Sequence, residues 1–145
     1  MARQEANMCE HLSFAASESY KLLRANLNFT IPSDESSAIG ITSSTRAEGK
    51  STTAINLSYT IAETGKKVLL IDADMRIPSV GIRMGVQKAP GLSNAIIGQT
   101  DVANCIYPSG KFGNWHVMPA GDIPPNPSEL LASSKFSDLL EFLKT

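Results

Sequence analysis

The sequence has few of the cysteines and histidines that build disulfide frameworks and zinc sites, and it has no long apolar run. Among its 145 residues there are two cysteines, Cys9 and Cys105, and two histidines, His11 and His116. Because the cysteines show no CxxC spacing, we expect both to be buried and reduced, and we expect ordinary structural roles for the two histidines. No run approaches the roughly 18 apolar residues of a transmembrane helix, and the N-terminus lacks the apolar stretch of a signal peptide. These absences predict a cytoplasmic protein.

The sequence also has no large excess of positive or negative charge. Thirteen lysines and arginines are nearly balanced by fourteen aspartates and glutamates, which leaves a formal net charge of −1. No overall positive field attracts nucleic acid, so we expect no nucleic-acid partner, and any anion site must be local. With 42% hydrophobic residues, the chain has enough apolar side chains to bury a core.

The spacing of hydrophobic residues predicts helices that alternate with strands. Residues 14–29 have the period of an amphipathic helix, with Tyr20, Leu23 and Leu27 on its apolar side. After a turn-rich connection, we expect a short strand (38–42), a helix that starts at Lys50 and ends near Gly65, a buried strand (67–72), a short helix (91–99), a strand (114–121) and one or two closing helices (128–145). This order predicts an α/β fold in which helices flank a mainly parallel sheet.

Residues 42–53, TSSTRAEGKSTT, end like a phosphate-binding loop. The usual pattern is GxxxxGK[ST], which Gly49, Lys50 and Ser51 fit, although Ser44 stands where the first glycine is expected. In such a loop, backbone N–H groups and the helix N-terminus bind phosphate, the lysine reaches the terminal phosphates, and the serine hydroxyl binds Mg²⁺. The loop predicts a nucleotide site; a chance GKST at a helix start is the structural alternative. We expect residues 1–37 to form an N-terminal helix and its connection, and residues 38–145 a nucleotide-binding domain.

Two aspartates, Asp72 and Asp74, follow the predicted strand 67–72. Ligands of open α/β sheets bind at the carboxyl ends of the strands, so we expect both side chains beside the loop. A carboxylate there can hold Mg²⁺ or accept a proton from a nucleophile. The structural alternative is turn chemistry, because aspartate readily caps turns.

Four segments in combination resemble the bacterial protein-tyrosine kinases, the P-loop kinases of capsular and exopolysaccharide synthesis. They are ESYKLLR (18–24), TSSTRAEGKST (42–52), LLIDADMRIP (69–78) and GDIPPNPSELL (121–131). The resemblance covers roughly residues 14–145. It implies a P-loop NTPase fold of the MinD/ParA-like superfamily and an autophosphorylating, ATP- and Mg²⁺-dependent tyrosine kinase.

The resemblance also implies roles for single residues. Lys50, Asp72 and Asp74 match the catalytic positions of the family, where the first aspartate is proposed to assist deprotonation of the tyrosine hydroxyl. Ser51, Asp72 and Asp74 match the positions that hold magnesium. The residues expected to bind ATP are Thr45, Arg46, Ala47, Glu48, Gly49, Lys50, Ser51 and Thr52.

Glu18, Lys21 and Arg24 occupy the positions of the family's ExxRxxR motif, which supports ring-like self-association. We expect these three side chains to share a face that the core does not need and to form a contact between copies of the chain. Lys21 stands in place of an arginine, and lysine cannot reproduce a guanidinium fork. The other partners implied are protein tyrosine substrates and a membrane adaptor of the polysaccharide co-polymerase type, which recruits the protein to the inner face of the membrane.

The loop departs from the family at Arg46 and Ala47, which replace proline and glycine. A left-handed Ala47 costs on the order of 1 kcal/mol, and a loop rearranged to keep Ala47 right-handed is the other possibility. Either loop keeps Gly49 and the amides at the start of the helix. We therefore expect phosphate binding without the first glycine.

The chain stops at Thr145, whereas the family continues through a Walker B strand and a C-terminal tyrosine cluster. Its tyrosines are Tyr20, Tyr59 and Tyr107, none near the C-terminus. We expect a truncated sequence whose kinase activity is weak or absent. Two alternatives are an ATPase of the chromosome-partitioning or septum-placement type, whose signature lysine would stand at Thr45, and a nucleotide-binding module without catalysis.

Overall fold

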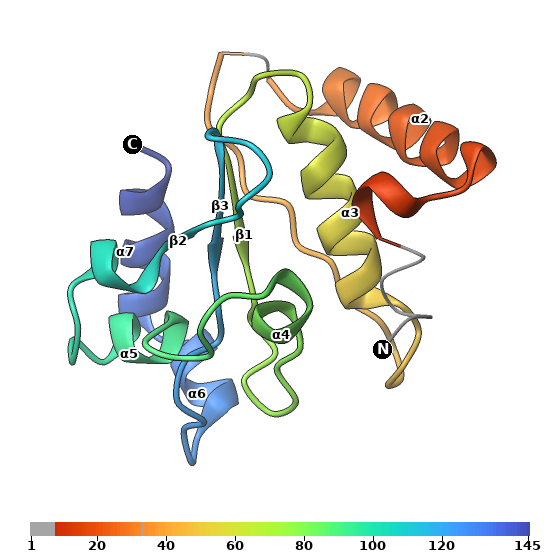
Figure 1. The fold of residues 1–145 in the computed structure, drawn as a ribbon. Coiled ribbons are helices and arrows are strands. Elements are labelled where there is room, and N and C mark those ends of the chain that lie inside the picture. The colour runs from red at the N-terminus through yellow and green to blue at the C-terminus, as the bar shows by residue number, and fades with distance from the viewer. Residues whose placement is uncertain (1–7, 33) are drawn as a thin grey trace. The chain divides into compact units, whose positions relative to one another are not determined.

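The structure, a computed structural model, describes residues 8–32 and 34–145 (Figure 1). These residues fall into two compact units, one within residues 1–68 and the other comprising residues 69–145. None of the helices in the described part of the chain is long and apolar enough to cross a membrane.

The first unit is built on two helices, α2 (Phe14–Thr30) and α3 (Lys50–Ala62), and the 3-10 helix η1 (Cys9–His11) precedes them. α2 begins where Ser13 caps it, because the side-chain oxygen of Ser13 accepts a hydrogen bond from the N–H of Ala16 at 3.2 Å. The two helices pack against each other, and η1 also contacts α3. The predicted helices 14–29 and 50–65 are thereby confirmed.

The side of α2 that faces α3 differs from the predicted one. Tyr20 and Leu27 are half-buried, as expected, but Leu23 is 38% exposed and Arg24 is half-buried in its place. Residues four and three positions apart lie in one row along a helix, and Tyr20, Arg24 and Leu27 form such a row. Hydrophobicity alone favours burial of Leu23, whereas the packing of α2 on α3 buries part of Arg24 instead.

The predicted strand at residues 38–42 is wrong. No strand forms there among the described residues, and Ile39 is 43% exposed. A strand needs a neighbour that accepts and donates its backbone hydrogen bonds, and the segment joins no sheet in the described part of the chain. The short apolar pattern of this segment is compatible with a strand, but it does not show which other strand would pair with it.

The second unit contains a three-stranded sheet in the order β1 (Val68–Ile71), β3 (Trp115–Met118) and β2 (Tyr107–Pro108), although Val68 itself is assigned to the first unit. β1 and β3 run in the same direction (Figure 1), whereas β2 pairs with β3 in the antiparallel sense. The α/β class is confirmed, but the sheet is mixed rather than mainly parallel. The connection of residues 109–114 is too short for the crossover that a parallel neighbour requires.

Helices surround this sheet and supply most of the core of the second unit. They are α4 (Val80–Met84), α5 (Leu92–Ile96), the 3-10 helix η2 (Val102–Cys105), α6 (Pro127–Leu131) and α7 (Ser134–Leu143). The buried core contains Met75, Leu92, Ile96, Cys105, Met118, Ala120 and Leu139. The helices predicted at 91–99 and 128–145 are confirmed, and Cys9 and Cys105 are buried and do not form a disulfide bond, as expected. α4, η2 and β2 were not predicted, because elements this short show no clear periodicity.

Gly91 and Gly121 lie where two loops of the second unit meet. The N–H of Leu92 donates to the carbonyl of Pro119 at 2.8 Å, and the N–H of Ser93 donates to the carbonyl of Ala120 at 2.9 Å. A Cβ atom on Gly91 would clash with the backbone of Pro119 and Gly121. Glycine is therefore required at position 91 by the close approach of two backbones.

We expect Gly91→Ala to lower the free energy of unfolding by about 2 kcal/mol, because the clashing atoms are backbone and cannot rotate away. Urea unfolding measures the loss. Gly113→Ala is the matched control, since its added Cβ meets nothing within 4 Å. Equal losses for the two variants would contradict the predicted clash.

Candidate nucleotide and carboxylate sites

The predicted phosphate-binding loop of the first unit contains a left-handed glycine directly before α3. Gly49 has φ of 93° and forms the N-cap of α3, whose first residue is Lys50. The carbonyl of Gly49 accepts the N–H of Thr53 at 2.9 Å, which closes the first turn. A Cβ atom at Gly49 would meet nothing within 4 Å, so the position requires glycine for its backbone conformation and not for space. The loop and the helix N-terminus together fit an anionic ligand such as a polyphosphate.

Ala47 adopts the left-handed conformation, with φ of 59°. Of the two possibilities considered from the sequence, the structure therefore has the strained one. The strain costs roughly 1–2 kcal/mol, since the Cβ of an L-residue approaches its own carbonyl in this region. Ala47 and Gly49 thus both turn the backbone in the left-handed sense immediately before α3.

Glu48, which lies between these two residues, braces the loop. Its Oε2 accepts the N–H of Thr45 at 3.3 Å, and the Ser43 hydroxyl donates to the carbonyl of Thr45 at 2.8 Å. Hydrogen bonding to the side chain and the backbone of Thr45 lowers the pKa of Glu48 below its ordinary value. The loop is therefore shaped by its own polar side chains, and Arg46 lies on its exposed surface.

In the second unit, Asp72 is a buried carboxylate that organises the backbone after β1. It is 4% exposed. Its Oδ1 accepts the N–H of Asp74 at 3.0 Å, and its Oδ2 accepts the N–H groups of Ser79 at 3.1 Å and Val80 at 3.0 Å. Ser79 and Val80 are the N-cap and first residue of α4, so Asp72 caps a helix that lies seven residues further along the chain.

Burial raises the pKa of Asp72 above its ordinary value, although the three backbone hydrogen bonds act in the opposite direction. The negative charge of Asp74 contributes to the rise. A carboxylate with a raised pKa is a better proton acceptor. The turn chemistry considered as an alternative from the sequence is therefore present in the structure, and it coexists with an electrostatic environment suited to proton transfer.

Asp74 is more accessible than Asp72. It is half-buried, and its Oδ1 accepts the N–H of Ile77 at 3.0 Å. Its Oδ2 makes no hydrogen bond to any residue that the structure describes. Asp74 therefore retains an oxygen for a cation or a water molecule. Among the described residues, no group of three His, Cys, Asp or Glu side chains is placed to hold a metal ion.

The loop that carries Asp74 is linked to the segment GDIPPNPSELL (121–131). Nη2 of Arg76 donates to the hydroxyl of Ser128 at 3.1 Å, and Ser128 belongs to α6. α6 starts in the PPNP sequence, with Pro127 in its first turn. No local pattern could have predicted this contact, because the two residues are 52 positions apart.

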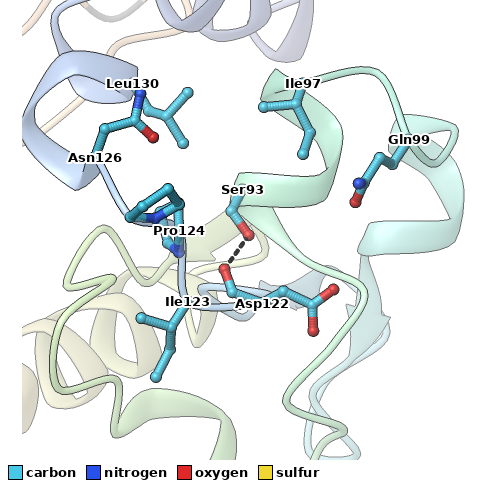
Figure 2. Close-up of a pocket in the computed structure, with 9 residues that line it drawn as sticks. Ser93, Ile97, Gln99, Asp122, Ile123, Pro124, Asn126 and Leu130 are labelled. Carbon is cyan, nitrogen blue, oxygen red and sulfur yellow. Dashed lines mark hydrogen bonds between the residues drawn. The ribbon is translucent and has the colours of Figure 1, made fainter.

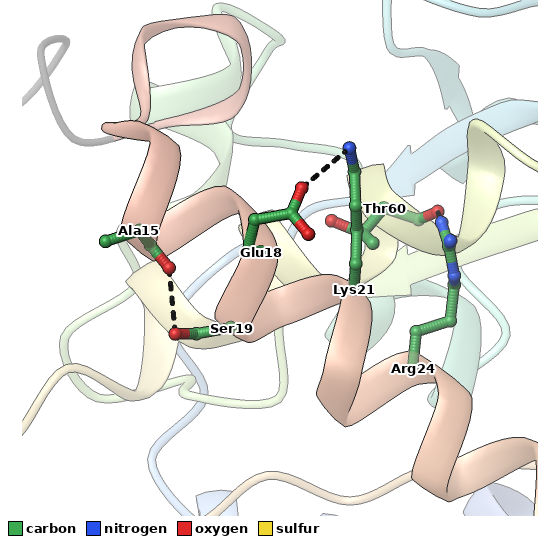
Figure 3. A network of polar contacts seen from close by, with 6 residues as sticks. All are labelled: Ala15, Glu18, Ser19, Lys21, Arg24 and Thr60. Atoms are coloured by element: carbon green, nitrogen blue, oxygen red, sulfur yellow. Dashed lines mark hydrogen bonds and ion pairs between the residues drawn. The ribbon is translucent and has the colours of Figure 1, made fainter.

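The predicted contact residues of α2 have different surroundings (Figure 3). Glu18 and Lys21 are exposed and form an ion pair at 3.5 Å. Nη1 of Arg24 instead donates to the carbonyl of Thr60 in α3 at 2.6 Å. The expectation that the core needs none of the three is wrong for Arg24, because this side chain joins the two helices of the first unit.

We expect Arg24→Ala to lower the free energy of unfolding by about 1 kcal/mol, since it removes a charge-assisted hydrogen bond from a half-buried site. Lys21→Ala is the matched control. It removes only an exposed ion pair, for which we expect a change below about 0.5 kcal/mol. Chemical denaturation of both variants checks the difference. If Arg24→Ala were no more destabilising than Lys21→Ala, the hydrogen bond to Thr60 would contribute nothing to the fold.

Comparison with known proteins supports the assignment of the fold. The sequence model of a family described as "AAA domain" matches residues 37–136. The chain is 38% identical over 123 residues to the tyrosine-protein kinase YwqD of Bacillus subtilis, covering 85% of this chain and 52% of YwqD. It is 39% identical over 127 residues to the putative tyrosine-protein kinase CapB of Staphylococcus aureus, covering 88% of this chain and 55% of CapB.

A solved structure shows the same architecture. The kinase domain of the Escherichia coli tyrosine kinase ETK superposes with a TM-score of 0.86 at 33% identity, covering 94% of this chain and 53% of that domain. The resemblance to bacterial tyrosine kinases and the P-loop NTPase fold are thereby confirmed. The chain spans about half the length of the curated relatives it matches.

Proposed function

Since the chain belongs to the AAA domain family, which it matches over residues 37–136, we propose that it is the ATP-binding part of a protein-tyrosine kinase. The observation that carries the proposal is the combination of a phosphate-binding loop with Asp72 and Asp74 in a chain whose relatives are named tyrosine-protein kinases. We further propose that the kinase autophosphorylates and regulates capsular or exopolysaccharide synthesis.

The loop and the first turn of α3 would hold the nucleotide. ATP supplies the phosphoryl group that is transferred, and Mg²⁺ neutralises the charge of its terminal phosphates. The N–H of Thr45 already donates to Glu48, so the amides from Arg46 to Thr52 would provide the hydrogen-bond donors, and the left-handed Gly49 turns the chain into the helix. Lys50 adds positive charge for the terminal phosphates, and the Ser51 hydroxyl is the proposed magnesium ligand.

The two aspartates would divide the remaining work. We assign to Asp72 the acceptance of the tyrosine proton, because its pKa is raised by burial. Its backbone hydrogen bonds hold the carboxylate in one orientation. We assign to Asp74 a contact with magnesium, directly or through water, because its Oδ2 has no partner among the described residues.

Self-association is the part of the proposal that the structure changes most. Glu18 and Lys21 are exposed and pair with each other, whereas Arg24 donates a hydrogen bond to Thr60 in α3. We therefore propose that Glu18 and Lys21 offer the contact to another copy of the chain. Other proposed partners are protein tyrosine substrates and a membrane adaptor that recruits a cytoplasmic kinase to the inner face of the membrane.

Light scattering tests the contact between copies. The double variant Glu18→Ala/Lys21→Ala should unfold at the same denaturant concentration as the unmodified chain and show a lower mass wherever the unmodified chain is oligomeric. A double variant that keeps the oligomeric mass would move the contact elsewhere on the chain.

The partitioning-type ATPase is less well supported. Its signature lysine would stand at Thr45, and the relatives reported above are named tyrosine-protein kinases. The experiment that separates the two functions follows transfer of radiolabel from ATP to a tyrosine-containing peptide. It uses the 145-residue chain and a fusion in which the second half of YwqD follows it. We expect little transfer by the chain and clear labelling by the fusion; ATP hydrolysis by the fusion without any labelled tyrosine would favour the ATPase.

A further inference from the structure

A pocket of about 260 Å³ lies in the second unit between α5 and α6 (Figure 2). Ile97, at the end of α5, and Leu130, in α6, face each other across it, with Pro124 and Ser93 nearby. The residues that line it are Ser93, Ile97, Gln99, Asp122, Ile123, Pro124, Pro125, Asn126 and Leu130. Four of these residues form the IPPN sequence (123–126), which has no role in the proposed nucleotide site or in the proposed functions of Asp72 and Asp74.

The floor of the pocket is held by a buried hydrogen-bond network. Asn94 is 4% exposed and uses both its amide oxygen and its amide nitrogen. Its Oδ1 accepts the N–H groups of Gly91 at 3.0 Å and Asp122 at 3.2 Å, and its Nδ2 donates to Asp122 Oδ2 at 2.8 Å and to Gln99 Oε1 at 3.2 Å. The hydroxyl of Ser93, which is 2% exposed, donates to the carbonyl of Asp122 at 2.6 Å. The carboxylate and the amide at the edge of the pocket are therefore fixed before any ligand arrives.

The wall of the pocket is rigid and apolar. Pro124 and Pro125 have fixed φ angles and no N–H group, so this stretch loses little conformational entropy when a ligand binds. Ile123 is 67% exposed and Ile97 is 43% exposed. Exposed isoleucines at the mouth of a concave site gain by being covered.

Size and charge restrict what can bind. Binding sites for small molecules commonly measure about 300–1,000 Å³, so a pocket of about 260 Å³ suits one side chain better than a nucleotide. The only charged side chain among the lining residues is Asp122. Its negative charge disfavours phosphate groups and favours a hydrogen-bond donor. An aromatic ring that carries a hydroxyl group combines these properties, because proline and aliphatic side chains cover its faces while the hydroxyl donates to the carboxylate.

We propose that this pocket binds the side chain of an unphosphorylated tyrosine in a polypeptide segment and so docks the substrate. The inference rests on the proposed kinase function for its choice of tyrosine. The bond from Arg76 to Ser128 ties the loop of Asp74 to α6, whose N-cap residue Asn126 lines the pocket. A phosphorylated tyrosine is repelled by Asp122, so the same pocket favours release of product.

The test measures peptide binding to the 145-residue chain by calorimetry without nucleotide. Four peptides differ at one position, which is tyrosine, phenylalanine, phosphotyrosine or lysine. We expect tyrosine to bind about threefold to tenfold more tightly than phenylalanine, since one hydrogen bond is lost. The phosphotyrosine peptide should bind still more weakly than the phenylalanine peptide. Asp122→Asn should reduce the difference in affinity between the tyrosine and phosphotyrosine peptides. Tightest binding by the lysine peptide, equal binding by all four peptides or competition by ATP would overturn the proposal.

Matched variants locate the site. Ile123→Ala should weaken binding of the tyrosine peptide about fivefold. Ile82→Ala removes an isoleucine of similar exposure, 59%, on α4 and outside the pocket, and should leave binding unchanged. Unfolding curves that match the unmodified chain exclude misfolding, and equal effects of the two variants would overturn the assignment.

Radiolabel transfer keeps the two proposals separate. If Ile123→Ala does not change the rate at which the YwqD fusion labels tyrosine, the proposed docking site is contradicted and the proposed kinase function is supported. If the chain binds the tyrosine peptide but the fusion never labels tyrosine, the peptide site is supported and the proposed kinase function is contradicted.

Discussion

Lys50→Met is expected to weaken binding of ATP with magnesium at least tenfold, which corresponds to about 1.4 kcal/mol. Methionine keeps most of the length and the apolar stem of lysine but removes its positive charge. Lys50 is the first residue of α3, directly after the left-handed Gly49, where anions approach the helix N-terminus. Calorimetric titration of the chain with ATP and Mg²⁺ measures the affinity.

A second lysine controls for the loss of charge alone. Lys67 is exposed and belongs to the same compact unit, just before β1. Lys67→Met changes the net charge by the same amount and should leave the affinity within about twofold, since exposed charges outside a site are screened by salt. Equal affinities for Lys50→Met and the unmodified chain would mean that the loop is not the nucleotide site.

Asp72→Ala is expected to lower the free energy of unfolding by about 2–4 kcal/mol at neutral pH. The change leaves the N–H groups of Asp74, Ser79 and Val80 without their acceptor. Relief from burying a charge offsets part of this loss. Urea unfolding measures the change, and Asp138→Ala, on the exposed side of α7, should cost less than about 0.5 kcal/mol.

The same residue predicts a dependence on pH. Burial raises the pKa of Asp72 in the folded chain, so between the ordinary value of about 3.9 and the raised value the folded state binds more protons than the unfolded state. The contribution of Asp72 to stability therefore falls as pH rises through this window. Asp72→Asn removes the titrating group and should remove that part of the slope. An identical slope in Asp72→Asn and the unmodified chain would contradict the assignment.

These results also decide how a loss of kinase activity is interpreted. Asp72 is both the proposed proton acceptor and the cap of α4. A loss of tyrosine labelling in Asp72→Asn of the fusion would report on catalysis only if the unfolding curve is preserved. Asp74→Asn is the cleaner test of charge, because Asp74 Oδ2 bonds to none of the described residues.

Much of the site could be predicted from local sequence. GKS at the start of a helix and two aspartates after an apolar strand identify their chemistry by residue type and spacing, and the structure finds α3 starting at Lys50 and Asp72 directly after β1. The side of α2 that packs on α3 was predicted less well, because hydrophobicity alone favoured burial of Leu23. The predicted strand at 38–42 does not form, because no other strand in the described part of the chain pairs with it. Assignment of Lys50, Ser51, Asp72 and Asp74 to ATP and magnesium stays a prediction.

The sequence by itself determined the α/β class, the phosphate-binding loop and the order of the longer elements, because hydrophobic period, glycine position and helix caps act between residues close together along the chain. Only the tertiary structure decided that Asp72 caps α4, that Arg24 bonds to Thr60, that Arg76 reaches Ser128 and that Asn94 braces the pocket. These contacts join residues 8 to 52 positions apart. Whether a polar side chain finds such a partner depends on which backbones the packed core brings together, and no local pattern encodes that.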